Sequence, residues 1–525
     1  MLARPYQSLL DRLSVHIPQT RLIADPLRTL AYGTDASFYR LTPKVIVKVE
    51  NETEALAVLT NCRALKIPVT FRASGTSLSG QALSDSVLMV LGPEGWRNYH
   101  INEDYSEITL GAAVLGAEAN AYLASHGKKI GPDPASLNSA KIGGIVSNNA
   151  CGMASGITGN SMGTVLGMRI MFADGTVLDT RREDSRHAFL SRRRDIVDGV
   201  NELARRLKED PDTVSRIRRK YEIKNTTGYS VSALVNFDES IEMIEHLMIG
   251  SEGTLGFISE VTFRTLDVPA YKSTGLMLFP DIARACEAVV VLKECQVSAA
   301  ELMDRVSLRS VENKPGMPPY IKSLGDTVTA LLVESAADDT DSLERQVEEI
   351  NTRFAGFPMA RDFEFSTDPD QAAALWSIRS GLFPSVCHAR QKGTTVIIED
   401  IAVPIDQLRD CLMELQDMFE QYAYKDTIIW GHVFDGNVHF VLTPDLSDPG
   451  EIEKYKAFMQ ELADMVVDKY DGSLKAEHGT GRNMAPFVRR EWGDPIYDVM
   501  RKVKALFDPD HILNPGVIIN DDPEA

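Results

Sequence analysis

The chain has 525 residues, more than one hydrophobic core can organise, so we expect two or three domains. Hydrophobic residues make up 44% and charged residues 25% of the sequence, which is typical of a globular protein. The net charge of −20 argues against nucleic acid as a partner, because binding a phosphate backbone requires a basic surface.

The sequence predicts no membrane-spanning helix and no secretion signal. No apolar stretch reaches the length of about 18 residues that a span needs, and the N-terminus lacks the apolar middle and cleavage site of a signal peptide. The six cysteines are scattered without a C-x-x-C pair, which favours reduced thiols and provides no iron–sulfur ligand set. We therefore expect a cytoplasmic protein. Peripheral association with the inner face of the membrane stays open, and the oligomeric state is not predicted.

Strand and helix patterns are mixed in the first half of the chain. Residues 44–50 alternate like a strand, and Asn51 can cap a helix that runs to about Leu65. Further elements are predicted as strands at 68–71, 86–91 and 107–114, a helix at 116–126, and a hairpin at 165–178 that turns at Asp174-Gly175. The segment to about Arg264 is thus expected to be α+β.

The pattern changes after Val268-Pro269, where we place a domain boundary. The elements predicted beyond it are strands at 275–279, 327–334 and 394–403, and helices at 282–295, 342–354 and about 449–470. An antiparallel sheet that carries helices on one face is the natural assembly of these elements.

A pair of histidines brackets the clearest turn signal in the chain. Asp435-Gly436 between two apolar runs predicts a two-residue hairpin turn. In that register His432 pairs with His439, and both imidazoles project from one face together with Asn437. The alternative is an ordinary hairpin whose half-buried histidines have satisfied hydrogen bonds.

An acidic residue could complete a metal site with these histidines. Two neutral imidazoles and one carboxylate form a divalent-metal set that leaves a position for water or substrate. Glu477 is the candidate carboxylate, and its neighbour His478 would then serve as an acid or a base. The combination of four such residues favours the catalytic interpretation over the ordinary hairpin.

Small-residue loops in the first half of the chain indicate a long anionic ligand. Ser74-Gly75-Thr76-Ser77 follows a strand and can direct backbone N–H groups and hydroxyls at one pyrophosphate. Similar stretches occur at 131–136, 141–152 and 250–256, and four of them in one domain suit a dinucleotide. The two standard nucleotide-binding glycine motifs are missing, which argues against a nicotinamide cofactor on a Rossmann domain.

One region departs from the acidic background. Residues 181–224 contain 14 Lys and Arg against 9 Asp and Glu. A solvent-facing helical segment is the favoured interpretation. A docking patch for an acidic electron-transfer partner is the alternative.

Seven motifs occur in an order that resembles a known family. They are Ser74–Ser77, Gly131-Pro-Asp, Gly143-Gly144, Gly250–Gly256, Gly431–His439, Glu477-His478-Gly479 and Asp508–Gly516. Together they are similar to the FAD-linked D-2-hydroxy-acid dehydrogenases of the vanillyl-alcohol-oxidase superfamily, which include enzymes for D-lactate, glycolate and D-2-hydroxyglutarate. The resemblance covers residues 30–516.

The resemblance implies an α+β fold with a two-part FAD-binding domain and an α+β cap domain that has an antiparallel sheet. The domains it implies are an N-terminal segment at 1–37, the FAD-binding domain at 38–267, the substrate and metal-binding cap at 268–480, and a C-terminal segment at 481–525 that returns to the FAD domain.

Site residues are also implied by the resemblance. FAD would be bound by Ser74, Gly75, Thr76, Ser77, Pro132, Gly144, Ser147, Cys151, Gly253, Ile258 and Asn514. It would be noncovalent, because the first loop lacks the histidine that covalent members often use. The divalent metal, zinc or manganese ahead of iron, would be bound by His432, His439 and Glu477. The catalytic residues would be His478 as the base, Arg379 for the substrate carboxylate, and Asn437. A surface role for Arg379 is the alternative.

The implied reaction is oxidation of a D-2-hydroxy acid to the 2-oxo acid, with hydride transfer to the flavin N5 and metal assistance. Phe383 and Ile398 occupy places where the hydroxyglutarate enzymes have a threonine and a lysine, and Phe434 replaces a glycine that would leave more room beside the metal. These departures favour D-lactate over a five-carbon diacid. D-2-hydroxyglutarate and glycolate are the alternatives.

Electrons would pass to an external acceptor: an iron–sulfur protein, a cytochrome, a flavoprotein or a quinone. Longer relatives fuse an iron–sulfur module to this flavin unit, so such a module could also be attached or separate. Other function classes remain open at this stage. They are an oxidase or ether-lipid-type synthase, a non-catalytic flavin-binding subunit of an electron-transfer complex, and a plain metallohydrolase.

Overall fold

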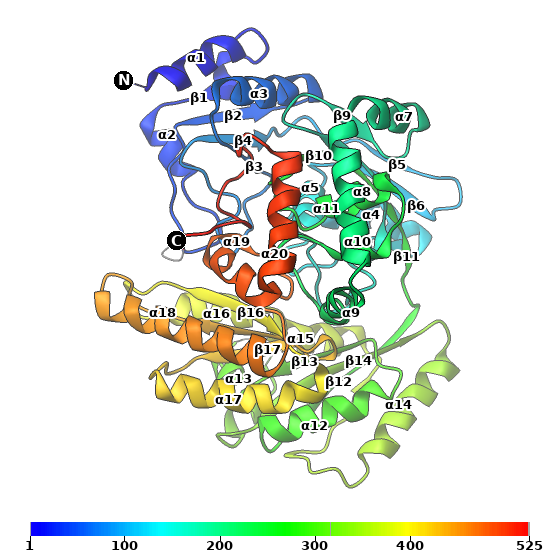
Figure 1. Ribbon diagram of the computed structural model, residues 1–525. Coiled ribbons are helices and arrows are strands. Elements are labelled where there is room, and N and C mark those ends of the chain that lie inside the picture. Colours follow the sequence, from blue (N-terminus) through cyan, green and yellow to red (C-terminus); the bar gives the residue numbers. More distant parts are fainter. Residues whose placement is uncertain (1, 315–316, 523–525) are drawn as a thin grey trace. The chain divides into compact units, whose positions relative to one another are not determined.

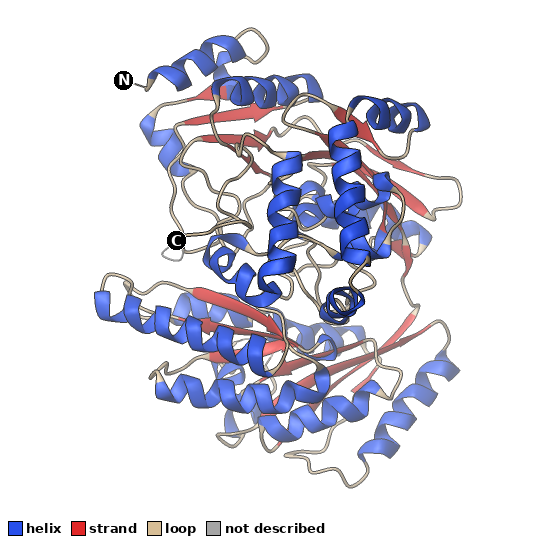
Figure 2. Cartoon of the chain, viewed as in Figure 1, coloured by secondary structure: helices blue, strands red, loops and turns tan. Residues whose placement is uncertain are grey.

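The structure is a computed structural model that describes residues 2–314 and 317–522. The chain forms two compact units: unit 1 comprises Met1–Asp267 and Glu477–Ala525, and unit 2 comprises Val268–Ala476. Helices and strands are mixed within each unit (Figure 2). Within the described residues, no helix combines the length and the apolar character that crossing a membrane requires.

Unit 1 contains two main sheets. The first has the order β1-β2-β4-β3, with β1 Leu22–Ile23, β2 Val45–Val49, β4 Val87–Leu91 and β3 Val69–Arg72. The second is antiparallel, in the order β5-β6-β10-β8-β9, with β5 Tyr99–Ile101, β6 Glu107–Gly111, β10 Phe257–Arg264, β8 Val165–Met171 and β9 Val177–Asp179. Two short strands, β7 Lys128–Lys129 and β11 Leu266–Asp267, pair separately. The β2, β4 and β3 strands run parallel.

The helices of unit 1 are α1 Arg4–Leu13, α2 Pro26–Ala31, α3 Glu52–Leu65, α4 Gly116–Leu123, α5 Ile142–Asn148, α6 Ser161–Thr164, α7 Glu183–Arg192, α8 Arg194–Lys208, α9 Pro211–Lys220, α10 Ser232–Asn236, α11 Ser240–Met248, α19 Gly481–Met484 and α20 Val488–Phe507. The predicted cap of α3 is confirmed, because the Asn51 side chain accepts a hydrogen bond from Glu54 N at 3.0 Å. The predicted hairpin at 165–178 is also confirmed, as β8 pairs with β9 across the Asp174-Gly175 turn.

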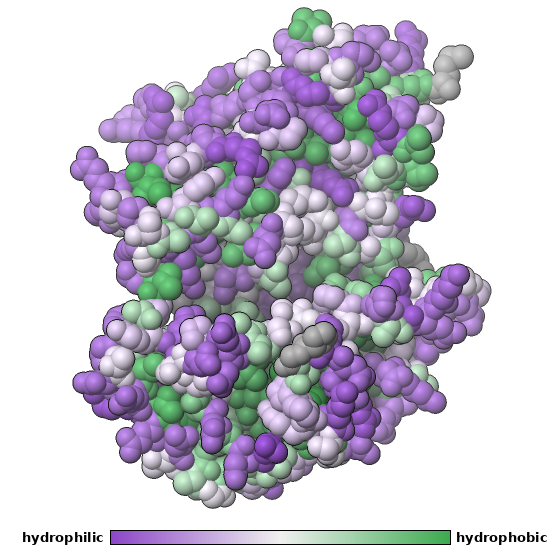
Figure 3. Space-filling model, turned by 180° about the vertical axis from the view of Figure 1, so that it is seen from behind, coloured by the Kyte–Doolittle hydropathy of each residue, from purple (hydrophilic) through white to green (hydrophobic). Residues whose placement is uncertain are grey.

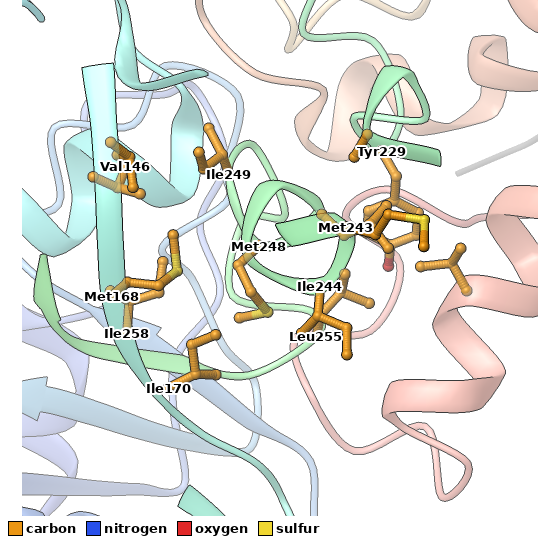
Figure 4. Packing of buried hydrophobic residues seen from close by; sticks show 14 of the residues in the cluster. Val146, Met168, Ile170, Tyr229, Met243, Ile244, Met248, Ile249, Leu255 and Ile258 are labelled. Carbon is orange, nitrogen blue, oxygen red and sulfur yellow. The ribbon is translucent and has the colours of Figure 1, made fainter. Parts of the chain in front are cut away.

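One part of the core of unit 1 is built from β8, β10, α5 and α11. Figure 4 shows Ile258 of β10 beside Met168 and Ile170 of β8, with Met248 and Ile249 close by. These side chains are almost completely buried. The packing fixes the position of the loop at 250–256, because that loop connects α11 directly to β10.

The second segment of unit 1 returns to the first sheet. Leu513 forms an isolated bridge with Val69 at the start of β3, and the Asn514 backbone N–H donates to Val69 O at 2.9 Å. The motif at 508–516 therefore lies against the strand that leads into the Ser74–Ser77 loop, although more than 400 residues separate them in sequence.

Unit 2 is built on one antiparallel sheet of seven strands in the order β15-β12-β14-β13-β17-β18-β16. The strands are β15 Phe365–Ser366, β12 Tyr271–Phe279, β14 Thr329–Ala337, β13 Ala299–Met303, β17 Ile428–His432, β18 Asn437–Leu442 and β16 Ile397–Ala402. The helices are α12 Ile282–Lys293, α13 Arg305–Val311, α14 Thr340–Phe354, α15 Pro369–Ser380, α16 Leu382–Ala389, α17 Leu408–Gln421 and α18 Pro449–Asp464. In Figure 1, α12, α17 and α18 lie in front of this sheet.

The two faces of β18 have different neighbours. Phe440 packs against Phe419 of α17 and Phe458 of α18, with ring centroids 5.3 and 6.0 Å away. Side chains alternate between faces along a strand, so Asn437 and His439 point to the opposite face. The helices that bury Phe440 therefore leave the histidine face of the sheet for other contacts.

The basic region at 181–224 is largely neutralised by its own neighbours. Arg205 forms ion pairs with Glu202 and Glu209 in α8, while Arg193 pairs with Asp174 and Asp195. Figure 3 shows the opposite side of the molecule, which is mostly hydrophilic with smaller hydrophobic areas between. These ion pairs favour the solvent-facing helical interpretation and reduce the positive charge that a docking partner would meet.

Candidate active site

The two histidines lie on neighbouring strands of unit 2, but they are not directly opposite each other. β17 and β18 pair Trp430 with His439, so the predicted pairing of His432 with His439 is wrong by two residues. The connection is a 3-10 turn at Val433–Asp435 followed by Gly436, not a two-residue turn. A shift of two residues leaves each side chain on its own face. His432 and His439 consequently still share a face, with ring centroids 5.1 Å apart.

Gly436 accounts for the wider turn. Its φ is 61°, in the left-handed region, and an added Cβ would lie 1.8 Å from Val403 O. Val403 N also donates to Gly436 O at 3.1 Å. The turn is thus held against the residue that follows β16, and this contact, rather than the Asp-Gly pair alone, sets the register.

Each imidazole of the pair faces a buried carboxylate through its Nδ1 atom. His432 Nδ1 lies 2.6 Å from Glu301 Oε1 of β13, and His439 Nδ1 lies 3.3 Å from Asp400 Oδ1 of β16. Both carboxylates are fully buried. The hydrogen bond between Glu301 and His432 selects the ring tautomer of His432 that presents Nε2 to a ligand, as in many metal sites. Nitrogen atoms of the two rings lie within 4.8 Å of each other, close enough to share one ion.

Asn437 adds an acceptor beside the two rings. Its Nδ2 donates to Asp400 Oδ1 at 2.7 Å and to Ile401 O at 3.0 Å, while its Oδ1 is buried and has no hydrogen-bond partner among the described residues. An unsatisfied buried acceptor is costly unless a ligand completes it. The two imidazoles fit a divalent cation, and this amide oxygen is a further acceptor on the same face of the sheet.

Arg379 joins the same face of the sheet from α15. Its Nε donates to Glu301 Oε2 at 2.5 Å, and its guanidinium carbon lies 5.9 Å from the Trp430 ring centroid. Only 11% of the side chain is exposed, so the surface role considered from the sequence is wrong. Burial opposes ionisation of Glu301, but the charges and hydrogen bonds of His432 and Arg379 hold its pKa below the ordinary value. The site therefore has a charged carboxylate at its centre.

The three residues expected to shape the substrate pocket lie on different elements of unit 2. Ile398 lies on β16 two residues before Asp400, hence on the same face as the histidines. Phe434, expected to narrow the space beside the metal, contacts α12: Lys293 Nζ donates to its carbonyl oxygen at 2.8 Å and lies 5.9 Å from its ring centroid. Phe383 belongs to α16.

Glu477 and His478 open the second segment of unit 1, where the backbone of His478 is tied to two of the small-residue loops. Its carbonyl oxygen accepts hydrogen bonds from Gln81 Nε2 at 2.8 Å and Asn148 Nδ2 at 3.0 Å. Glu477 Oε2 accepts from the buried Lys224 Nζ at 2.9 Å. Lys224 also donates to Gly152 O at 2.8 Å. These contacts orient both residues from within unit 1.

The Ser74–Ser77 loop begins directly after β3, and its side chains are only partly buried. Gly75 adopts a φ of +77°, which a glycine reaches without strain. An added Cβ at Gly144 in α5 would be in ordinary van der Waals contact with Ala73 Cβ at 3.4 Å and would meet no other atom within 4 Å. A backbone that a ligand can approach closely is what a dinucleotide requires, so these loops fit one.

The other residues predicted to contact FAD have distinct surroundings. Asn514 is a clamp: its Nδ2 donates to Gln81 O and Glu252 O, and its Oδ1 accepts from Thr70 Oγ1. The Ile258 side chain is part of the core, so a contact with flavin would come from its backbone. The remaining members lie in or next to the loops: Pro132 and Cys151 are buried, Ser147 and Gly144 are half-buried in α5, and Gly253 has a φ of +67°.

Glu252 is a buried acid that the sequence did not single out. Burial raises its pKa to about 8, despite the hydrogen bonds from Asn148 and Gln81 that lower it. The folded state thus holds the proton of Glu252 more tightly than the unfolded chain does, because the pKa of this carboxyl group in the unfolded chain is near 4.5. The contribution of Glu252 to the free energy of unfolding is fully present below about pH 4.5 and is lost as the pH rises through about 8.

Glu252→Gln removes this titration while keeping an acceptor for both amides. We expect the wild-type protein to lose about 3 kcal/mol of unfolding free energy relative to the variant between about pH 5 and about pH 8. Urea unfolding followed by tryptophan fluorescence at several pH values measures the difference. Parallel pH profiles for the two proteins would show that Glu252 does not titrate in this range.

Two known protein families match this chain, one in its first half and one in its second half. Residues 43–181 match the family described as FAD binding domain, and residues 268–518 match the family described as FAD linked oxidases, C-terminal domain. Glycolate oxidase subunit GlcD of Bacillus subtilis is 26% identical over 93% of this chain and 91% of its own length. A mitochondrial D-lactate dehydrogenase [cytochrome] of Arabidopsis thaliana is 25% identical over 91% of this chain and 73% of its own. The chain belongs to the family of FAD-linked D-2-hydroxy-acid dehydrogenases.

Members of this family differ in length. A D-2-hydroxyglutarate dehydrogenase of Pantoea ananatis is 25% identical over 93% of this chain, which spans about half, 49%, of that relative. Among solved structures, p-cresol methylhydroxylase aligns over 99% of both chains with a TM-score of 0.70 and 13% identity. An alkyldihydroxyacetonephosphate synthase covers 97% of this chain with a TM-score of 0.66 and 15% identity. These likenesses confirm the predicted two-domain α+β fold of the vanillyl-alcohol-oxidase type.

Three functional candidates in this family member were missed from the sequence. Glu301 is hydrogen-bonded to His432, Asp400 lies 3.3 Å from His439 Nδ1, and Lys224 donates to Glu477. Asp400 lies within the run 394–403 that was predicted as a strand, so alternation could have placed it on the histidine face. Lys224 belongs to the basic region at 181–224, which was expected to face solvent, so its burial was not predicted.

Proposed function

We propose that this protein oxidises a D-2-hydroxy acid, most readily D-lactate, to the 2-oxo acid with FAD as the oxidant. The observation that carries the proposal is the arrangement in unit 2, where His432, His439 and Arg379 converge on one sheet face around buried carboxylates. A carboxylate-binding arginine beside a cation site matches a substrate with a hydroxyl next to a carboxylate.

FAD would be bound noncovalently by unit 1. Support comes from the match to an FAD binding domain and from the partly open loop after β3. The residues proposed to hold the cofactor are Ser74, Gly75, Thr76, Ser77, Pro132, Gly144, Ser147, Cys151, Gly253, Ile258 and Asn514.

A divalent cation, zinc or manganese before iron, would be bound by His432, His439 and Glu477. Glu477 follows Ala476, whose N–H donates to Asp400 O at 3.3 Å. Asp400 is the strand partner of His439, so the covalent chain emerges next to the histidine strand. This connection supports Glu477 as the third ligand, and the donor types suit zinc or manganese.

Bound FAD and metal would supply hydride acceptance and polarisation of the substrate hydroxyl, respectively. Residues of the chain itself would accept the hydroxyl proton and bind the substrate. His478 would take the hydroxyl proton, helped by a backbone that Gln81 and Asn148 hold in place. Arg379 would bind the substrate carboxylate, and Asn437 would accept a hydrogen bond or contact the cation through Oδ1.

The preference for a short substrate rests on the apolar lining. Ile398 offers no positive charge on the histidine face, whereas a diacid would need a partner for its second carboxylate. D-2-hydroxyglutarate and glycolate are therefore the second candidates. Electrons would leave through an external acceptor, and the cytoplasmic location and the choice of acceptor stay predictions.

Anaerobic flavin bleaching tests the function directly. Under anaerobic conditions we expect D-lactate to bleach the yellow band of the purified protein at least about 10-fold faster than D-2-hydroxyglutarate, glycolate or L-lactate, because an unpaired second carboxylate or a lost methyl contact costs about 1–3 kcal/mol. The measurement is stopped-flow absorbance with a panel of D- and L-2-hydroxy acids.

The panel also separates the alternatives. Bleaching by none of the acids would sink the dehydrogenase proposal and favour a flavin-binding subunit, and faster bleaching by D-2-hydroxyglutarate would replace D-lactate. A colourless protein that lacks flavin would return the metallohydrolase to consideration.

A further inference from the structure

Glu301 occupies a position where burial of a charged side chain costs free energy of desolvation. It lies on β13, between β14 and β17 in the sheet, with no exposed surface. In the sheet it is opposite Leu332 on one side and His432 on the other. A buried carboxylate persists only when both of its oxygens have good partners.

The two oxygens of Glu301 have different partners. Oε1 lies 2.6 Å from His432 Nδ1, and Oε2 accepts a hydrogen bond from Arg379 Nε at 2.5 Å. The first contact directs Nε2 of His432 toward a metal. The second leaves the outer end of the guanidinium, Nη1 and Nη2, to form a two-pronged contact with another carboxylate.

The helix that carries Arg379 is fixed by a second, independent contact. Trp376 Nε1 donates to Glu334 Oε2 at 3.0 Å, one helical turn before Arg379. Glu334 lies on β14 two residues from Leu332, hence on the same face as Glu301. The guanidinium also lies over the Trp430 ring. The contacts of α15 thus fix the main chain of Arg379, and the hydrogen bond with Glu301 orients only its guanidinium group.

We propose that Glu301 is a positioning residue that sets both the metal ligand His432 and the carboxylate-binding Arg379, and thereby fixes the spacing between substrate hydroxyl and carboxylate. The proposal rests on the proposed function, since it assumes a cation at His432 and a hydroxy acid at Arg379. A single rigid carboxylate joins the two anchor points. A 2-hydroxy acid has its hydroxyl and carboxylate on adjacent carbons and fits that spacing, whereas a 3-hydroxy acid has one carbon too many.

Glu301→Gln tests this link because it keeps the size of the side chain. His432 and Arg379 contact different oxygens of Glu301, and glutamine has an acceptor at only one of these two positions. One partner therefore keeps its hydrogen bond, while the new NH2 group opposes an N–H of the other. We expect the dissociation constant for zinc to rise about 10- to 100-fold and the KM for D-lactate to rise about 10-fold. Zinc affinity is measured by competition with a colorimetric chelator, and KM is measured at saturating zinc so that it is separated from kcat.

Arg379→Lys provides the contrasting variant. It keeps the positive charge but loses the Nε–H donor and the planar fork, while His432 keeps its carboxylate. We expect its KM to rise and its zinc affinity to stay within about twofold of wild type. In the Glu301→Gln/Arg379→Lys double variant the KM effects should fall short of additivity, because both changes break the same contact.

Selectivity supplies a further readout that a loss of stability would not change. We expect the wild-type preference for D-2-hydroxybutyrate over D-3-hydroxybutyrate, measured by flavin bleaching, to fall by about 10-fold in Glu301→Gln. Glu399→Gln is the matched control. It removes another fully buried glutamate whose partners are Lys475 and Tyr455, on the opposite face of β16.

The outcomes separate this inference from the proposed function. If the wild type contains no metal or bleaches with no hydroxy acid, the proposed function fails first. If the wild type does both and Glu301→Gln retains its zinc affinity, KM and selectivity, the inference alone is overturned. Equal losses in Glu301→Gln and Glu399→Gln would also overturn it, because they would reflect a general cost of a missing buried charge. Flavin content and thermal unfolding identify variants that do not fold, and Arg379→Lys keeps the test available in that case.

Discussion

Replacing His478 with alanine is expected to slow reduction of the flavin by D-lactate by about 100-fold or more. The backbone of this residue is anchored through its carbonyl oxygen to Gln81 and Asn148, so removing the side chain leaves that anchoring in place. The change therefore removes the proposed proton acceptor and little else. Anaerobic stopped-flow measurement of the flavin band gives the rate.

The control for this variant is chemical. Dithionite should reduce wild type and His478→Ala equally fast, and both should contain the same amounts of flavin and metal. An unchanged rate with D-lactate would remove His478 from the role of base, and a loss of flavin would mean that the change had damaged the cofactor site instead.

Removing the metal is expected to have a comparable effect. Chelation, or His439→Ala, should lower the rate of flavin reduction by D-lactate at least about 100-fold, because the substrate hydroxyl then loses the cation that polarises it. Metal analysis of the purified variant should show less than about a tenth of the wild-type content. Adding zinc or manganese back should restore the chelated wild type but not the variant.

His246→Gln is a matched control for the loss of a buried histidine. His246 belongs to α11, where its Nδ1 contacts Glu242 O at 2.9 Å and its ring stacks on Phe237. This variant should keep its metal. Full activity in thoroughly metal-free wild type would contradict the metal-assisted reaction, whatever the variants do.

The histidine hairpin shows which features of a structure a local turn motif can predict. The Asp-Gly pair predicted the two strands and their shared face, and the structure confirms both. The register was wrong because the turn is decided by a tertiary contact: Gly436 lies against Val403, a residue that precedes it by 33 positions. Turn propensity does not include such a contact, but the two-residue period of the strand kept the functional side chains on the correct face.

Glu301 could not be predicted because its strand was not recognised. Ala299–Met303 is buried at all five positions, so it lacks the alternation that identifies a half-exposed strand. Its glutamate also disfavours a strand assignment. Only the pairing of β13 with β14 on one side and β17 on the other explains why this segment is extended.

The loops of unit 1 were recognised as ligand-binding segments, whereas the contacts that hold them were not. Glycine and serine patterns identify a flexible backbone, but they carry no information about a partner several hundred residues away. Asn514 was assigned to the cofactor through the resemblance. That role stays a prediction, and the structure shows in addition that its side chain joins Thr70, Gln81 and Glu252 to one another.

This clamp has a consequence for biosynthesis. Unit 2 is continuous in sequence, so a ribosome delivers all of it before residue 514 emerges. The loops that Asn514 joins are made early and must wait for it through the synthesis of more than 200 intervening residues. Domains that form as contiguous blocks can fold during translation, while pairings across long separations come late. A nascent chain arrested before position 514 should accordingly contain a folded unit 2 and an unfinished unit 1.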